Sequence, residues 1–185
     1  MNEFIFEKAK LDGVKIITPK QFCNEIGEFE KKYEREIYIS NHICFDITEE
    51  YKLLSDKGVL RGIHFQEPNP QARLISVLSG EALVAVVDLR RDSAKIGEWE
   101  TYKVNTVNRS VIYVPRGFGV GTFTLADKTI IEVKCSGQYY GENSQGICYD
   151  DADLDIDWGI TEKEKIVISQ KDRLLMSFRE YVESK

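Results

Sequence analysis

Residues 73–90 read RLISVLSGEALVAVVDLR, and they decide the fold class. Two runs rich in β-branched residues, 73–78 and 82–90, flank the polar sequence Ser79-Gly80-Glu81. Runs of this kind are typical of strands, and a short segment containing glycine is typical of the turn between them. The pattern predicts two antiparallel strands joined as a hairpin.

Further short runs of the same character follow along the chain. Each is rich in β-branched or aromatic residues and is bounded by Gly, Pro, Asn or Asp; they cover residues 99–104, 110–114, 120–125 and 129–135. A series of short strands separated by turns favours an antiparallel sandwich or barrel. The expected fold class is therefore all-β.

Helix is expected mainly at the end of the chain. Within residues 172–182, apolar side chains at 174, 175, 178, 181 and 182 fall on one helical face. Asp172 stands where a carboxylate can cap the free amides of a helix. The charged segment 28–36 fits a solvated helix or a loop. The chain has 185 residues and no repeat or linker, so one domain over residues 1–185 is expected.

The composition is that of an ordinary soluble globular protein, with 42% hydrophobic and 30% charged residues. The formal charge of -6 and the pI near 5.1 give no general attraction to nucleic acid or to an anionic membrane. An anionic ligand must then be captured by local cations. A basic leader and a long apolar segment are both missing from the sequence, so we expect a cytoplasmic protein without a membrane span.

The cysteines and histidines do not form a metal-binding pattern. The four cysteines are scattered without a Cys-x-x-Cys pair, and the two histidines, His42 and His64, lie far apart. We therefore expect reduced, mostly buried thiols and no catalytic metal.

Residues 58–66, GVLRGIHFQ, place a histidine near an arginine in an otherwise apolar strand. His64 can accept a proton near neutral pH, and Arg61 can hold a phosphate or carboxylate. In a regular strand these two side chains point to opposite faces, so contact with one ligand requires a bulge or sharp twist at Gly62. The pair suggests a small anionic substrate that loses a proton. The alternative is a hydrogen-bonded structural histidine.

Several further motifs accompany this run in a fixed order. They are RGIHFQ at 61–66, SGE at 79–81, VDLRR at 87–91, PRGF at 115–118, YY at 139–140, DD at 150–151, IDW at 156–158 and SQKD at 169–172. Over residues 58–172 the chain resembles the dTDP-4-dehydrorhamnose 3,5-epimerase family. The resemblance implies a cupin-type antiparallel β-sandwich or jelly roll, usually a homodimer, that acts without metal or cofactor on nucleotide-linked 4-keto sugars in surface polysaccharide biosynthesis.

The resemblance also implies roles for individual residues. His64 falls on the catalytic base of the family, and Asp172 falls on the carboxylate that pairs with it. Arg61 falls on a substrate-binding arginine, and Lys171 on a lysine that contacts the nucleotide diphosphate. Arg73 takes the place of a lysine that supports the developing enolate, with its charge retained but its shape changed.

The sequence departs from the family at the proton donor. The tyrosine that acts as general acid falls on Val133, and a binding-site histidine falls on Val120. A valine cannot donate a proton. We expect Tyr140 to be the replacement acid, with Tyr139 or a bound water as alternatives. Packing of the two tyrosines against the sugar or the base is an equal alternative, in which Tyr139 binds substrate.

The expected activity is a cofactor-independent epimerisation at C3, C5 or both carbons of a nucleotide-linked 4-keto sugar, either a 6-deoxy sugar or a heptose. The missing acid favours inversion at one carbon, and the nucleotide can be dTDP or GDP. A non-catalytic protein that binds sugar nucleotides is the alternative, although a pure binder has no need of an oriented base. A ketoisomerase requires a histidine pair that this chain lacks.

Overall fold

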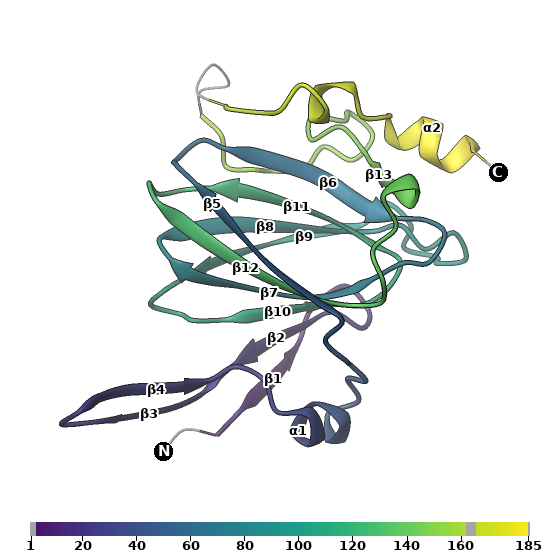
Figure 1. Cartoon of the computed structure of the whole chain (residues 1–185). Helices are drawn as coiled ribbons and strands as arrows, with labels where there is room; N and C mark the ends of the chain where they lie inside the picture. Colours follow the sequence, from purple (N-terminus) through teal and green to yellow (C-terminus); the bar gives the residue numbers. More distant parts are fainter. Residues whose placement is uncertain (1–2, 162–165, 185) are drawn as a thin grey trace.

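The computed structural model describes residues 3–161 and 166–184 as two facing antiparallel sheets with a projecting hairpin (Figure 1). The six-stranded sheet has the order β1 (Ile5–Lys8), β2 (Lys15–Thr18), β10 (Val111–Val114), β7 (Ala72–Ser79), β12 (Thr129–Ser136) and β5 (Glu49–Ser55). The five-stranded sheet has the order β13 (Ser144–Gly146), β6 (Leu60–Gln66), β11 (Phe118–Thr124), β8 (Glu81–Asp88) and β9 (Trp99–Asn105). The projecting hairpin is formed by β3 (Lys20–Asn24) and β4 (Gly27–Lys31). The all-β, cupin-type sandwich expected from the sequence is confirmed.

The hairpin predicted over residues 73–90 is wrong in its pairing. Strands β7 and β8 both form, but β7 pairs with β10 and β12, whereas β8 pairs with β9 and β11. Gly80, between them, has a φ of 78°, and a Cβ there would collide with Thr129. The turn therefore packs against β12 and leads the chain from one sheet to the other. An apolar pattern specifies the buried face of a strand but not its partner.

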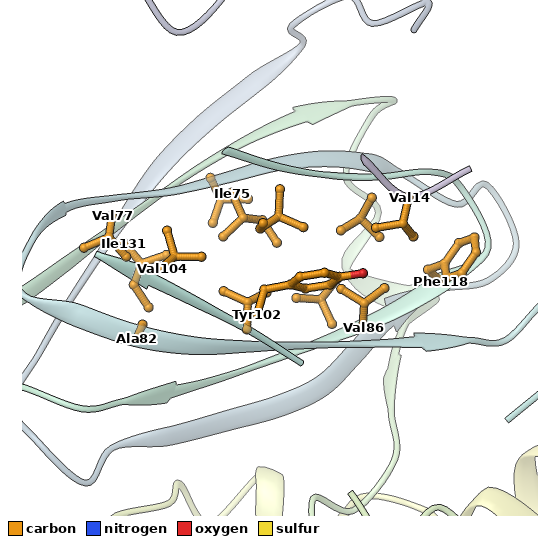
Figure 2. Packing of buried hydrophobic residues seen from close by; sticks show 14 of the residues in the cluster. Val14, Ile75, Val77, Ala82, Val86, Tyr102, Val104, Phe118 and Ile131 are labelled. Atoms are coloured by element: carbon orange, nitrogen blue, oxygen red, sulfur yellow. The ribbon is translucent and has the colours of Figure 1, made fainter. Parts of the chain in front are cut away.

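The central strand β8 is buried on both faces. Val84 and Val86 belong to the cluster between the two sheets, where Figure 2 shows Val86 with Ile75, Tyr102 and Phe118. Ala85 and Val87 point the other way, into a second cluster beneath the C-terminal segment. Because both faces are covered, the sequence of β8 is a continuous apolar run and does not alternate between apolar and polar residues.

The C-terminal helix is shorter than the sequence predicts. Residues Asp172–Leu174 form a 3-10 turn, η3, and helix α2 covers only Phe178–Glu183. Between them the chain is extended, and Met176 bridges to Ile147. This pairing with the sandwich overrides the helical spacing of the apolar residues. Ser177, rather than Asp172, caps α2 through a capping box with Glu180.

Two smaller expectations also need correction. The segment 28–36 contains the strand β4 before helix α1 (Arg35–Ser40), because β4 pairs with β3 across a tight turn ending at Gly27. The thiols are not mostly buried: Cys135 is buried, whereas Cys23 and Cys44 are exposed. Within residues 3–161 and 166–184, every helix is too short or too polar to cross a membrane.

Candidate active site

A cavity of about 260 Å³ opens between the two sheets at the end nearest the C-terminal segment. Both sheets contribute to its wall, together with the segment that precedes and includes η3. The lining residues are Tyr51, Leu53, Arg61, His64, Arg73, Ile75, Val120, Thr122, Val133, Ser169 and Asp172. Charged groups thus gather in a cavity whose remaining walls are largely apolar.

A bulge in β6 brings Arg61 and His64 to the same cavity. His64 lies opposite Val120 of β11, and Arg61 lies opposite Thr122, with the register shifted between them. Gly62 has a φ of 93°, and a Cβ there would lie 2.6 Å from the carbonyl oxygen of Val120. Only glycine fits this close approach without a shift of β11. The irregularity expected at Gly62 is confirmed.

The C-terminal segment places a buried carboxylate against the histidine. Both carboxylate oxygens of Asp172 lie 3.3 Å from His64 Nε2, and Oδ2 accepts a hydrogen bond of 3.1 Å from the Gly62 amide. The Asp172 amide in turn donates to Ser169 Oγ at 3.0 Å. A carboxylate acceptor at Nε2 favours the tautomer that leaves a lone pair on Nδ1. Asp172 therefore orients the imidazole and does not cap a helix.

The surroundings of His64 favour its neutral, basic form. Burial lowers the pKa of His64 below its ordinary value of 6.5, and the positive charges of Arg73 and Lys171 lower it further. Asp172 opposes the shift through its charge and its hydrogen bond without cancelling it. At neutral pH the imidazole is thus free to accept a proton.

Arg73 projects from β7, on the sheet opposite His64. Its Nη1 donates a hydrogen bond of 2.9 Å to the backbone carbonyl of His64. Its Nε is buried and has no hydrogen-bond partner among the described residues. An unpaired buried donor is costly, and Arg73 also lines the cavity, so its guanidinium is a candidate to bind an anionic or carbonyl oxygen.

The neighbouring thiol is not a candidate for catalysis. Cys135 lies opposite Arg73 in the β12–β7 register and is fully buried. Burial raises the pKa of the Cys135 thiol to about 11, although Arg73 partly opposes this. The thiol therefore stays protonated and inert at neutral pH.

A second pocket of about 320 Å³ adjoins the first and shares Tyr51, His64 and Arg73 with it. It adds Tyr139 and Lys171, two residues that the sequence predicts to bind substrate. Its other lining residues are Glu49, Phe65, Gln66, Gln71 and Ser144. This pocket extends the inner cavity toward the loop after β12.

Tyr140 lines neither pocket. Its hydroxyl pairs with Gln138 Oε1 at 3.4 Å, and its backbone amide donates to Gln66 Oε1 at 2.7 Å. Gln66 Nε2 also donates to the carbonyl of Gln138 at 3.0 Å, so these contacts fix the loop after β12. Six of the seven predicted site residues therefore surround the two pockets, and Tyr140 supports the loop beside them.

Tyr51 is a lining residue that was not expected from the sequence. Tyr51 lies on β5, which pairs with β12. Its charged neighbours Glu50 and Lys52 make this segment look unlike a strand in the sequence. The signal that could reveal it is the alternation of Tyr51 and Leu53 with the charged residues Glu50 and Lys52. This alternation places Tyr51 and Leu53 on the face that lines the cavity.

The fold and the site together define a β-sandwich protein with a carboxylate-paired histidine and an arginine in one cavity. Among residues 3–161 and 166–184, no cluster of three His, Cys, Asp or Glu side chains is arranged to hold a metal. A sequence model of the dTDP-4-dehydrorhamnose 3,5-epimerase family matches residues 8–180. The chain belongs to this family.

Individual relatives agree with this assignment. The dTDP-4-dehydrorhamnose 3,5-epimerase of Methanothermobacter thermautotrophicus is 37% identical over 180 residues, which cover 97% of each chain. A dTDP-6-deoxy-D-glucose-3,5-epimerase from Legionella pneumophila, solved with dTDP-4-keto-L-rhamnose, superposes with a TM-score of 0.91 at 30% identity, over 96% of this chain and 94% of that one.

A third relative, the dTDP-4-dehydrorhamnose 3,5-epimerase of Bacillus anthracis, was solved with TDP and pyrophosphate. It superposes with a TM-score of 0.90 at 28% identity, covering 95% of this chain and 100% of that one. These relatives are epimerases, and this chain is an isomerase of the same kind. The alternative of a protein that only binds sugar nucleotides is not supported.

Proposed function

We propose that the protein inverts one or both carbons beside the ketone of a dTDP-linked 4-keto-6-deoxy sugar. The observation that carries this proposal is the contact between His64 and Asp172 in a cavity that Arg73 enters from the opposite sheet. The names of the relatives support the choice of sugar and nucleotide. Residues 1–185 act as one catalytic domain in this proposal.

The chemistry begins with a weakly acidic C–H bond. Removal of a proton beside a ketone gives an enolate whose charge rests on the carbonyl oxygen. His64 takes this proton, and Asp172 stabilises the imidazolium that forms. Arg73 offers its unpaired Nε–H to the enolate oxygen. Return of a proton to the opposite face of the carbon completes the inversion.

The two pockets bind different parts of the substrate. The inner cavity, with His64, Arg61 and Arg73, receives the sugar. The outer pocket receives the nucleotide, where the Lys171 ammonium can pair with the diphosphate and the Tyr139 ring can stack on the base. Arg61 donates to Ser55 Oγ at 3.1 Å and keeps further N–H groups for the substrate.

The protein forms a homodimer in this proposal. The β3–β4 hairpin projects from the sandwich (Figure 1), and its side chains Phe22, Ile26 and Phe29 are exposed. An exposed apolar group on a projecting hairpin supports contact with a second copy. The family resemblance supports a cytoplasmic enzyme that supplies sugars for surface polysaccharides.

Proton NMR in D₂O tests the proposed function. A dTDP-linked 4-keto-6-deoxyglucose, incubated with the protein, should lose the proton signals at C3, C5 or both and should yield an inverted product. The variant His64→Asn should abolish exchange at both carbons and keep its affinity for dTDP, measured by calorimetry. A GDP-linked 4-keto sugar run in parallel tests the choice of nucleotide. Binding of dTDP by the unmodified protein without exchange of any sugar proton would refute the proposal.

A further inference from the structure

Inversion needs a proton donor on the cavity wall that faces His64. The six-stranded sheet supplies this wall, and most of its lining side chains have no proton to give: Leu53, Ile75 and Val133 are hydrocarbon. Arg73 is occupied with the backbone of His64 and stays charged throughout the reaction. We propose that Tyr51 is the general acid that returns the proton, an assignment that rests on the proposed function.

The strand register directs Tyr51 into the cavity. Tyr51 lies directly opposite Val133 in the antiparallel pairing of β5 with β12, and Val133 lies opposite Ile75 of β7. Residues directly opposite each other in an antiparallel pair share one face of the sheet. Val133 and Ile75 belong to the core between the sheets, so the Tyr51 side chain is on the interior face too.

The two sheets place the tyrosine and the histidine on opposite walls. On the five-stranded sheet, His64 lies opposite Val120 of β11, and Val120 lies opposite Val86 of β8. These three residues form a row across this sheet, as Tyr51, Val133 and Ile75 do across the other. Tyr51 and His64 are both lining residues of the inner cavity and of the outer pocket. A sugar between these rows presents one face of its ring to the base and the other to the phenol.

The Tyr51 hydroxyl is available as a donor. It makes no hydrogen bond with any described residue, and 38% of the residue's surface is exposed. Burial raises the pKa of the Tyr51 phenol above its ordinary value of 10, although the charge of Arg73 partly opposes this. The phenol is therefore protonated at neutral pH, and Arg73 can stabilise the phenolate that remains after proton transfer.

Other possible donors are less well placed. Tyr139 is 52% exposed and lines only the outer pocket, and Tyr140 lines neither pocket. Cys135 lies opposite Arg73 on the neighbouring strand, is fully buried and also lines neither pocket. Tyr51 is thus the phenol that reaches the inner cavity from the wall opposite His64.

The proposed step is balanced in protons and electrons. His64 Nδ1 takes the proton, and the electron pair of the C–H bond becomes the enolate. When the enolate returns to the ketone, its carbon forms a bond to the hydroxyl proton of Tyr51 on the opposite face. The imidazolium then releases its proton to water, and the phenolate takes one from water.

The test separates proton removal from inversion. Tyr51→Phe should lower net inversion by about 10²-fold or more, the usual contribution of one positioned acid, while His64 still exchanges the sugar proton with D₂O from its own face. Retained exchange also shows that the variant folds and binds substrate. Tyr140→Phe removes a phenol that lines neither pocket, so it is the matched control and should leave the ratio of inversion to exchange unchanged.

A second variant moves the phenol by one strand. In Tyr51→Phe/Val133→Tyr the hydroxyl returns on the neighbouring strand, roughly 4.8 Å away, and inversion should recover in part. Inversion by Tyr51→Phe at the unmodified rate would overturn the assignment and leave the proposed function intact. Absence of both exchange and inversion in the unmodified protein would overturn the proposed function and the assignment together.

Discussion

The carboxylate of Asp172 lies 3.3 Å from His64 Nε2, although 108 residues of sequence separate the two. The same carboxylate accepts the Gly62 amide, so it anchors both the base and the bulge that carries the base. Its burial leaves it few alternatives to these two partners. Orientation of the imidazole and the shape of β6 are therefore coupled through one side chain.

This coupling predicts the behaviour of Asp172→Asn. An amide at this position can donate to Nε2 and so favours the tautomer with its proton on Nδ1, which cannot act as the base. We expect exchange of the sugar protons in D₂O to fall by about 10²-fold with the fold retained. Circular dichroism and the exchange rate per folded molecule measure the two effects separately.

Ser177→Ala is the matched control for Asp172→Asn. It removes the observed cap of α2 and should cost about 1 kcal/mol of unfolding free energy without changing exchange per folded molecule. If Asp172→Asn shows this same pattern, with lost stability and unchanged exchange, then Asp172 has a structural role only.

The pH dependence of kcat/KM provides a second prediction. His64 works as a base only when neutral, so activity should be full above pH 6.5 and should fall as the pH drops through its lowered pKa. Lys171 lowers the pKa of His64, so Lys171→Gln should raise the pH at which activity falls. Asp172 raises the pKa of His64, so Asp172→Asn should lower this pH. Shifts of the same sign in both variants would contradict the assignment of this pH dependence to His64.

The sequence predicts the pairing of His64 with Asp172 because the two residues stand in short, recognisable motifs. The bulge at Gly62 also follows from strand geometry, since Arg61 and His64 have opposite parity in one strand. The C-terminal helix was harder to predict, because Leu174 and Leu175 have helical spacing but the next residue, Met176, bridges to Ile147. Such a long-range pairing leaves no local signal in the sequence.

Tyr51 illustrates a different limit of the sequence. Its strand lies at the sheet edge, where charged residues point to solvent and mask the β pattern. Its importance depends on being opposite Val133, and that register is fixed only when β5 pairs with β12. The sequence shows that Val133 cannot be an acid, but only the structure shows which phenol lies beside it.

Replacement of Gly62 by alanine should disrupt the site and the fold together. The new Cβ would lie 2.6 Å from the Val120 carbonyl oxygen at a φ of 93°, so both the backbone and β11 must shift. We expect a loss of about 3 kcal/mol of unfolding free energy, measured by urea denaturation. Gly159→Ala is the control: Gly159 has a φ of 64°, but no atom of the described residues lies within 4 Å of the new Cβ, and the change should cost about 1 kcal/mol. Equal losses in the two variants would show that the contact with Val120 is unimportant.

The proposed dimer can be tested on the β3–β4 hairpin. Phe22 and Phe29 lie opposite each other in its register, so they share one face. The double variant Phe22→Glu/Phe29→Glu should convert a dimer into a monomer in light scattering at micromolar concentration, because charged residues in an apolar interface are strongly disfavoured. Lys20→Glu, at the base of the same hairpin, is a control for the change in charge. A monomeric mass for the unmodified protein would exclude the dimer.

Arg73 should be needed for formation of the enolate rather than for binding. Its Nη1 donates to the His64 carbonyl, and its Nε has no hydrogen-bond partner among the described residues. A methionine at 73 therefore removes both a structural donor and the proposed oxyanion donor. We expect Arg73→Met to lower the rate of proton exchange by about 10²–10³-fold, the usual cost of losing one such donor, with little change in the affinity for dTDP. Arg73→Lys restores the charge but not the planar fork, and it should recover part of this loss. If proton exchange is as slow in the lysine variant as in the methionine variant, the hydrogen-bond geometry of the guanidinium matters more than its charge. If both variants exchange the sugar proton at the unmodified rate, another group stabilises the enolate oxygen.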